Sequence, residues 1–330
     1  TIDIMEQITM AQNWLMNNHF FLNIDFTRVL FFFLIINTSC QIIDQPEIAP
    51  SFIKIEKINF ETINPNQGTS SEKISDAWIY INGNLEGAYE LPATIPLHYQ
   101  GINELSIYPG IKRNGISADR KRYPFYTSYD TTMNLIADSI ILLQPKTNYE
   151  EDLYFWIEDF EDQQHKFENH NTSQAELNII DFPNTDLFEG NAGVISMDSS
   201  QLYCELRTNE LDFNLFPKNL NIPAYIELNY ANNYPFTIGI LHKDQSITAY
   251  FKQALITLVP TYENEISWNK TYLFIPDATN FFSSVTEFDL YISITNFNNE
   301  NNIKVLLDNF KVIYRQWKEN IFGLYILSVT

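Results

Sequence analysis

The sequence contains little cysteine and little glycine. Its 330 residues include two cysteines, Cys40 and Cys204, so a framework of several disulfides cannot hold the chain together. It has only ten glycines, and neither a P-loop nor a dinucleotide-binding fingerprint occurs among them. The G-x-S-x-G pattern of a nucleophile elbow is missing as well. The common nucleotide-dependent and serine-hydrolase chemistries are therefore not indicated.

Positive charge is also scarce. The chain has 20 Lys and Arg residues against 41 Asp and Glu residues, a formal net charge of −21. Residues 1–40 contain one basic and three acidic residues, so the rest of the chain has a net charge of −19. Such a balance repels phosphate backbones and does not attract anionic lipid. We expect no nucleic-acid partner, and any membrane attachment would need another basis.

Long hydrophobic runs are missing too. Val29–Ile36 is an apolar run of eight residues that follows Arg28. As a helix it would be about 12 Å long, far short of the roughly 30 Å of a bilayer core. A short apolar segment that follows a positive charge and ends in small residues is typical of a cleavable export signal. The alternative is a buried β-strand near the N-terminus.

The end of this segment, Ile36-Asn37-Thr38-Ser39-Cys40, resembles the lipobox of bacterial lipoproteins. Thr38 and Ser39 fit that pattern, whereas Asn37 stands where an apolar residue is usual. The resemblance implies cleavage before Cys40 and acyl chains on its sulfur, with two or more chains giving stable membrane anchoring. Pro109–Tyr126 is in turn similar to loops of uncharacterised Bacteroidota surface lipoproteins, and the two resemblances together imply a lipoprotein of the cell envelope, anchored in the outer membrane of a Bacteroidota-type bacterium.

This interpretation divides the start of the chain into two parts. Residues 1–39 are the signal peptide, and residues 40–50 are a lipidated linker with two prolines. The chain opens on threonine, and a start at Met16 gives a polar segment of suitable length, which would leave residues 1–15 untranslated. Met5 and Met10 are alternative starts.

Hydrophobic residues are plentiful, at 45% of the chain with 15% aromatic, which is enough to build cores without disulfides. Beyond residue 50 no segment has a 3.6-residue apolar period. Short alternating runs separated by Asn, Gly, Pro and Asp predict an all-β protein made of sandwiches. We divide it into a small β-sandwich at 51–146, a larger one at 152–315 and a C-terminal tail at 316–330.

The first module carries a clear hairpin signal. Asn82-Gly83 separates Ala77–Ile81 from Asn84–Leu91, and this dipeptide supplies the positive φ angles of a type I′ turn. Together with strand-like segments at Pro92–Leu97 and Gly101–Tyr108, the pattern resembles small sandwich modules of the carboxypeptidase-regulatory or PEGA kind. The resemblance implies a fold and no activity.

A basic loop follows this hairpin region. Five basic residues lie close together in an otherwise acidic chain: Lys112, Arg113, Arg120, Lys121 and Arg122. One interpretation is a binding loop for an acidic partner, a sugar acid or a lipid headgroup. The other, which we favour, is a solvated loop whose charges pair with the protein's own carboxylates.

The two ends of the second module resemble a known fold. Trp156–Asp162 and Leu306–Val312 are similar to the first and last strands of galactose-binding-like jelly rolls, a fold shared by many carbohydrate-binding modules. The resemblance implies that these strands lie side by side. It also implies that Glu161 and Asp308 bind a structural Ca²⁺, with backbone carbonyls completing an oxygen shell. The alternative is that both carboxylates are exposed strand ends.

Several aromatic residues of this module could stack on sugar rings. An aromatic ring suits the apolar face of a pyranose, and neighbouring amides such as those of Asn232 and Asn233 can reach its hydroxyls. Only one or two such rings can be exposed, because the sandwich needs most of them inside. The candidate ligand-binding residues are Tyr225, Tyr230, Tyr234 and Trp268, with Phe236 beside them.

The leading hypothesis for function is a non-catalytic glycan- or polysaccharide-binding module that needs no cofactor besides the structural calcium. A second hypothesis is a structural or assembly subunit of an envelope complex for secretion or surface motility. The third is an unrecognised glycoside hydrolase. Its candidate carboxylates are the acids within Glu158–Asp162, but alternate residues of one strand point to opposite faces, so at most a couple of them could flank one sugar. Cys204, in a strand-like alternation, is expected to be a buried small hydrophobe.

Overall fold

The chain was analysed as a computed structural model. It describes residues 7–10, 12–13, 49–181, 183–209, 222–244, 250–275, 285–315, 318–319 and 325–326. The signal and lipobox segments, including Cys40, lie outside these residues, as does most of the tail. No helix within the described ranges is long and apolar enough to cross a membrane. Residues 50–330 form one compact unit, and the predicted all-β class is confirmed.

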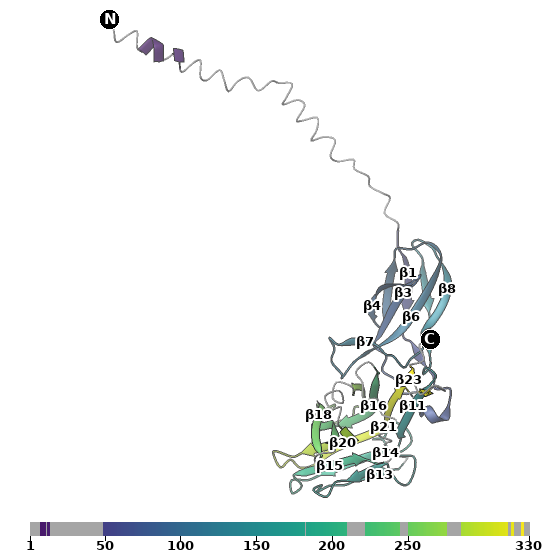
Figure 1. The fold of residues 1–330 in the computed structure, drawn as a ribbon, viewed down its shortest axis with the longest axis vertical. Coiled ribbons are helices and arrows are strands. Elements are labelled where there is room, and N and C mark those ends of the chain that lie inside the picture. The colour runs from purple at the N-terminus through teal and green to yellow at the C-terminus, as the bar shows by residue number, and fades with distance from the viewer. Residues whose placement is uncertain are drawn as a thin grey trace. The chain divides into compact units, whose positions relative to one another are not determined.

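The N-terminal part of this unit is a small β-sandwich (Figure 1). Its first sheet has the order β5-β1-β9. These strands are β1 (Ser51–Ile55), β5 (Ala93–Leu97) and β9 (Ile140–Leu143). The second sheet has the order β4-β3-β6-β7, with β8 also paired to β6. Its strands are β3 (Asp76–Ile81), β4 (Asn84–Glu90), β6 (Gly101–Lys112), β7 (Arg120–Arg122) and β8 (Tyr129–Leu135).

The predicted hairpin is present between β3 and β4. Asn82 and Gly83 have φ angles of 51° and 80°, as a type I′ turn requires. Alternate residues of the two sheets then point inward, and isoleucines such as Ile53, Ile79 and Ile107 form a core without any exposed atoms. A short pair, β2 (Asn59–Phe60) with β10 (Lys146–Thr147), follows at the far end.

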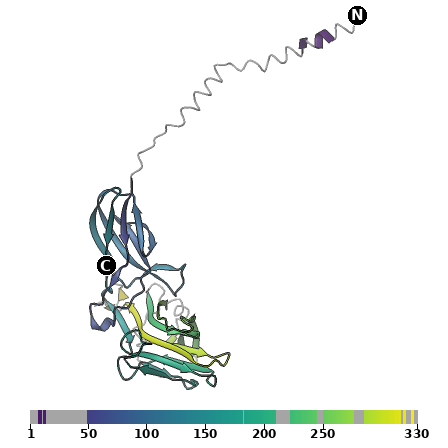
Figure 2. The same cartoon turned by 180° about the vertical axis from the view of Figure 1, so that it is seen from behind.

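The C-terminal part is a larger sandwich of two antiparallel sheets (Figures 1 and 2). One sheet has the order β13-β14-β21-β16-β19, with β11 also paired to β21, and the other has the order β12-β15-β20-β17-β18. From β14 onward the chain passes back and forth between the sheets, except for the hairpin of β17 and β18 within the second sheet, as in a jelly roll. The first sheet contains β11 (Leu153–Glu158), β13 (Leu177–Ile180), β14 (Ala192–Met197), β16 (Ala224–Asn232), β19 (Asn269–Phe274) and β21 (Ile303–Arg315). The second contains β12 (Phe167–Asn169), β15 (Tyr203–Thr208), β17 (Phe236–Asp244), β18 (Phe251–Leu258) and β20 (Val285–Thr295).

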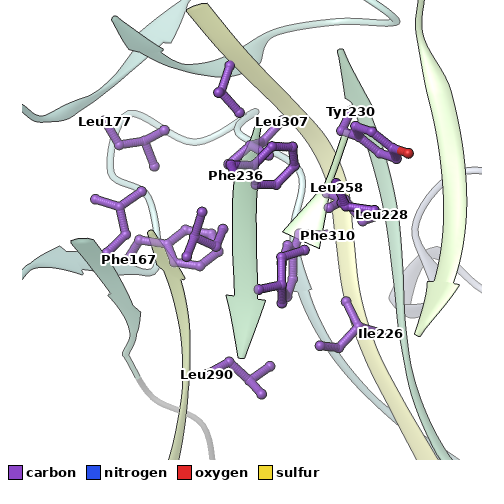
Figure 3. Packing of buried hydrophobic residues seen from close by; sticks show 14 of the residues in the cluster. Phe167, Leu177, Ile226, Leu228, Tyr230, Phe236, Leu258, Leu290, Leu307 and Phe310 are labelled. Atoms are coloured by element: carbon purple, nitrogen blue, oxygen red, sulfur yellow. The ribbon is translucent and has the colours of Figure 1, made fainter. Parts of the chain in front are cut away.

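Figure 3 shows side chains from both sheets meeting in the core of this sandwich. Ile226, Leu228 and Phe310 come from the first sheet, and Phe167 and Phe236 from the second. Burying an apolar side chain stabilises the fold by about 1.5–3 kcal/mol at each such position. This burial is the main source of stability in a domain without disulfides. Cys204 lies in this core as a free thiol, as predicted.

The first and last strands of this sandwich lie side by side, as the resemblance implied. β11 and β21 are antiparallel, with Trp156 opposite Val312 and Glu158 opposite Phe310. The register between β16 and β21 shifts in the middle, where Glu227 faces Lys311 but Asn229 faces Asp308. β21 therefore has one extra residue there, and Asn309 has a left-handed φ of 48°. This β-bulge changes the direction of the side chains around Asp308.

A third cluster joins the two sandwiches. Phe60, Tyr123 and Tyr149 of the N-terminal part pack against Tyr225 and other rings of the larger sheet. The cluster, which we call the junction, consists of Phe60, Ile111, Tyr123, Phe125, Tyr126, Tyr149, Tyr225, Tyr272 and Ile313.

A buried carboxylate lies within the junction. Glu227 of β16 accepts hydrogen bonds from the hydroxyls of Tyr123 (2.8 Å) and Tyr149 (3.1 Å), and its other oxygen is 3.0 Å from the ammonium of Lys270. Lys311 is fully buried nearby and donates to the carbonyls of Gln67 and Thr69, both at 2.8 Å. Burial lowers the pKa of Lys311 to about 8.

Candidate functional site

Two of the predicted sugar-stacking residues are inside the protein. Tyr225 and Tyr230 on β16 are only 4% and 5% exposed. Every residue of β16 is buried, because one face of the strand covers the sandwich core and the other covers the junction or its flank. Phe236 is likewise part of the core. These rings have no free face for a ligand, and we remove them from the candidate site.

Trp268 and Tyr234 are half-buried. The Trp268 indole donates to the carbonyl of Asp186 at 2.9 Å and its ring packs near Phe188. Tyr234 lines a hollow of about 440 Å³ together with Tyr262 and amide side chains that include Asn233. We call it the Tyr234 hollow; it contains Asn233, Tyr234, Pro260, Tyr262, Glu263, Glu300, Asn301, Asn302 and Ile303. It is one place where a predicted aromatic and predicted amide lie together.

The basic loop is engaged with the protein itself. Arg120 contacts Asp76 (2.5 Å) and Glu90 (2.6 Å), and Lys112 also contacts Glu90 (2.7 Å). These two cations lower the pKa of Glu90 to about 2. Arg113 and Lys121 approach Asp119, and Arg122 lies over the ring of Tyr108. The favoured interpretation, internal pairing, agrees with this arrangement.

Asp308, one of the two predicted calcium ligands, is not an exposed strand end. It is 1% exposed, and its Oδ2 atom has no hydrogen-bond partner in the described part of the chain. Burial, together with the nearby carboxylates of Glu189 and Glu161, raises the pKa of Asp308 to about 8. A buried, unpartnered carboxylate oxygen close to two more carboxylates is a costly arrangement unless a proton or a cation is present.

Glu161, the other predicted ligand, faces the loop that carries Gly190. Its carboxylate accepts the backbone N–H of Asn191 at 2.8 Å, and a Cβ at Gly190 would lie 1.7 Å from its oxygen. Among the described residues no three His, Cys, Asp or Glu side chains form a ready metal cluster. A Ca²⁺ held by two carboxylates and backbone oxygens does not need three, and hard oxygen donors are what Ca²⁺ prefers. The residues at the bulge therefore fit the ion.

The neighbouring acids of β11 have structural surroundings. Glu158 is buried, accepts the N–H of Phe160 at 2.8 Å and also that of Lys166, and burial raises its pKa. It closes the loop after β11.

A further surface, not among the candidates predicted from the sequence, is the side of the sheet β12-β15-β20-β17-β18 that points away from the sandwich core. We call it the outer face. On β15, Cys204 and Leu206 point into the core, so Tyr203, Glu205 and Arg207 point outward. On the adjacent β20, Leu290 and Ile292 point inward, which places Tyr291 and Ser293 outward. Opposite them on β17 are Gly239 and Thr237.

An aromatic ring fills the middle of this face. A Cβ at Gly239 would lie 2.4 Å from Cε1 of Tyr291, so the ring of Tyr291 occupies the space that a side chain at position 239 would take. The ammonium of Lys252 lies 5.4 Å from the ring centre of Tyr203 and 5.7 Å from that of Tyr291. Arg207 likewise lies 5.5 Å from the ring of Tyr250. Aromatic rings and cations thus form one layer across the sheet.

A buried carboxylate holds this layer in place. Glu205 has no exposed side-chain surface, and one oxygen accepts two hydrogen bonds from the Arg207 guanidinium at 2.9 Å each. Its other oxygen contacts the Lys252 ammonium and the Tyr203 hydroxyl. Burial raises the pKa of Glu205, but the hydrogen bonds from Lys252, Tyr203 and Arg207 outweigh this effect and lower it. The carboxylate therefore stays charged at neutral pH and fixes its three partners.

A signal for this site was present in the sequence. Tyr203-Cys204-Glu205-Leu206-Arg207 alternates large polar residues with apolar ones, and this predicts a strand with one polar face. The alternation shows that the residues share a face. It cannot show that Tyr291 and Lys252, which lie about fifty to ninety positions later, complete it.

No known family model matches the chain, and no curated protein matches it either. Among solved structures it is similar to a xylan-binding domain from family 22 of carbohydrate-binding modules, with 11% identity and a TM-score of 0.36, over 50% of this chain and 97% of that one. It is also similar to the family 11 module of a cellulosomal cellulase of Clostridium thermocellum, with 12% identity, a TM-score of 0.33 and coverage of 47% and 91%. A third match is a structure on the promiscuous specificity of β-sandwich carbohydrate-binding modules, with 12% identity, a TM-score of 0.36 and coverage of 81% and 98%.

Proposed function

We propose that this protein is a non-catalytic polysaccharide-binding protein and that the outer face is its binding surface. The observation that carries the proposal is the half-buried ring of Tyr203, which the Glu205 carboxylate fixes together with Lys252; Tyr291, which is only 5% exposed, lies within this layer and offers no free ring face. Sugar recognition needs flat apolar area for the ring faces and rigid polar groups for the hydroxyls. The outer face supplies both on one sheet.

Rigidity favours binding at this surface. Side chains that are already ordered lose little conformational entropy when a ligand arrives, and more of the contact energy then appears as affinity. Glu205 orders Tyr203, Arg207 and Lys252 in the free protein. Lys252, which remains 42% exposed over the rings, is the group that a sugar would displace or hydrogen-bond.

The test is a glycan array followed by calorimetry with the polysaccharides that bind. We expect Tyr203→Ala to weaken binding at least tenfold, because it removes an outer ring and one partner of Glu205. Tyr234→Ala, which changes a half-buried ring in the Tyr234 hollow, should leave affinity unchanged. If Tyr234→Ala abolishes binding and Tyr203→Ala does not, the hollow is the site. Absence of binding to every glycan on the array would refute the function.

We also propose that the protein is exported and lipid-anchored through Cys40 in the cell envelope, on the outer membrane. The support is the Val29–Cys40 pattern and the net charge of −19 after residue 40, which leaves acyl chains as the means of attachment. Mass spectrometry of the protein isolated from its own membranes should find a diacylated Cys40 at the N-terminus. An unmodified thiol there, with residues 1–39 still attached, would contradict it.

We further propose that Glu161 and Asp308 bind a structural Ca²⁺ at the bulge. The support is the unpartnered Oδ2 of buried Asp308 beside further carboxylates. The ion would supply charge neutralisation for the three acids. The chain's own contribution is to hold Asp308 in place through the bulge and Glu161 against the Gly190 loop.

A further inference from the structure

β9 is an edge strand without the usual protection against pairing. In the described part of the chain it pairs only with β1, in parallel. Its sequence, Ile140-Ile141-Leu142-Leu143, contains no charge and no proline. Ile140 and Leu142 are 65% and 59% exposed, so no segment within the described ranges covers their side chains. A flat apolar strand at a sheet edge is a template for pairing with another chain.

The other edge strands of this sandwich are protected. β5 contains Pro96, which cannot donate to a neighbouring strand. β4 contains Glu86 and Glu90, and β8 contains Asp130. β7 consists of Arg120, Lys121 and Arg122. Because charges and prolines are the common means of blocking edges, their absence from β9 alone among these strands indicates an edge that is used.

At two residues of β9 the backbone N–H and C=O groups point away from β1 and can pair with a further strand. The N–H of Phe52 donates to the carbonyl of Ser139, and Phe52 lies opposite Ile140 in the parallel register. In such a register the backbone groups of Ser139, Ile141 and Leu143 face β1, and those of Ile140 and Leu142 face away from it. The two residues with outward backbone groups are therefore the two with exposed side chains.

We propose that β9 pairs with β9 of a second copy of this chain, antiparallel and about a two-fold axis. With the axis at Ile141, Ile140 of each copy lies opposite Leu142 of the other, and both are hydrogen-bonded pairs. The outward backbone groups of the two residues are then all satisfied. The result is a continuous sheet with the order β5-β1-β9-β9-β1-β5, and the interface is isologous.

Charge at the ends of β9 supports this orientation and this occupant. Asp138 precedes the strand and Lys146, whose ammonium lies 2.9 Å from Glu61 of its own chain, follows it, and both are exposed. In an antiparallel pair of copies with the axis at Ile141, Asp138 lies opposite Gln144 of the second copy, and the second copy's Lys146 is its diagonal neighbour, on both sides of the interface. A parallel arrangement would instead bring like charges together. The strand is thus complementary to itself.

The test is sedimentation velocity of the 330-residue chain at about 1 to 100 µM in physiological salt, where its like charges are screened. We expect a dimer for the wild type and for Leu85→Lys, which introduces a charge at another exposed leucine of the same sandwich. Leu142→Lys should weaken the dimer at least tenfold. Dimers that tolerate Leu142→Lys, or a wild type that is monomeric throughout, would overturn the proposal.

Disulfide trapping tests the register. In a Cys40→Ser background the remaining native cysteine, Cys204, is buried. Hydrogen-bonded antiparallel partners have Cα atoms about 5.5 Å apart, which a disulfide can bridge. We expect a mixture of Ile140→Cys and Leu142→Cys chains to form covalent dimers, and each variant alone to form few. Equal yields in all three samples would contradict the register, and so would no cross-link in the mixture.

Discussion

At the scale of single residues, Asp308 is the group whose surroundings are most unusual. Its carboxyl is buried at a bulge, leaves one oxygen without a partner in the described chain, and lies near Glu161 and Glu189. Desolvation and like charge both favour its neutral form, which accounts for a pKa of about 8. Either a proton or a cation must neutralise the charge of the Asp308 carboxylate, and we expect the proton and the cation to compete for it.

Stability without calcium should therefore depend on pH through Asp308. The folded protein keeps its proton up to about pH 8, whereas the unfolded chain releases it near pH 4. Stability from this group is complete below about pH 4 and is lost as the pH rises towards 8. In EDTA, we expect the wild type to lose about 4 kcal/mol relative to Asp308→Asn between about pH 5 and about pH 8.5. Urea denaturation at both pH values measures the difference.

Calcium should reverse this loss. At about pH 8 few protons compete with Ca²⁺ for the carboxylate. Calcium at about 1 mM should therefore raise the melting temperature of the wild type more at about pH 8 than at about pH 5. Asp308→Asn serves as the control because it keeps the size of the side chain. An equal calcium response in Asp308→Asn would show that this carboxylate does not bind the ion.

Residue-level prediction from the sequence succeeded where a local pattern was enough. The pairing of the first and last strands of the larger sandwich and the Asn82-Gly83 turn were both predicted in this way, whereas the role of Glu161 and Asp308 as calcium ligands stays a prediction. Tyr225 and Tyr230 were wrongly expected to be exposed. Tyr230 lies on the face of β16 that covers the sandwich core, and Tyr225 lies on the opposite face, whose burial alternation along the strand does not reveal. The second cover over β16, the junction, comes from residues about a hundred positions earlier in the chain.

At the scale of elements, the bulge in β21 positions Asp308, the proposed calcium ligand, and part of the junction. Asn309 occupies the left-handed region there, and its amide accepts from Thr69 at 2.9 Å and donates to Glu189. Asn tolerates this conformation better than most residues. The strands themselves were predictable from alternation. The bulge was not, since no residue pattern distinguishes an extra residue in a long strand.

The bulge can be tested with two substitutions at one position. Asn309→Gly and Asn309→Ala both remove the hydrogen bonds of the amide. Only alanine is also strained by the left-handed φ, because glycine has no Cβ. We expect alanine to be less stable than glycine by about 1 kcal/mol. Urea denaturation of both variants gives the difference directly. Equal stabilities would mean that the backbone relaxes at this position and that the bulge is not held in place.

At the scale of the whole compact unit, residues 50–330, the junction makes the two sandwiches depend on each other. Its aromatic residues come from both, and its buried charges, Glu227, Lys270 and Lys311, lie where water is excluded. The fold class and the presence of two sandwiches followed from the sequence. The junction did not, because pairing between buried charges on distant strands leaves no local pattern.

We expect the two sandwiches to unfold in one transition. Guanidinium denaturation of variants that keep either Trp78 or Trp156 should give coincident curves, because these residues report on different sandwiches. Glu227→Ala should lower stability by about 3–5 kcal/mol and separate the two curves, because it leaves Lys270 and Lys311 uncompensated. Glu205→Ala removes a buried carboxylate on the outer face and should leave the curves coincident. Separate wild-type curves would contradict the coupling.

The junction also decides how the gene can be divided. A fragment that begins at Leu153 would carry the jelly roll with Tyr225, Tyr272 and Ile313 stripped of their covering rings. In this fragment Glu227 would be exposed to water and would lack its two tyrosine hydrogen-bond donors. Lys311 would likewise be exposed and would lack its two carbonyl acceptors. We expect such a fragment to aggregate and to be insoluble when it is expressed by itself. Libraries and fusions made from this protein should therefore begin before Ser51 and keep both sandwiches in one reading frame.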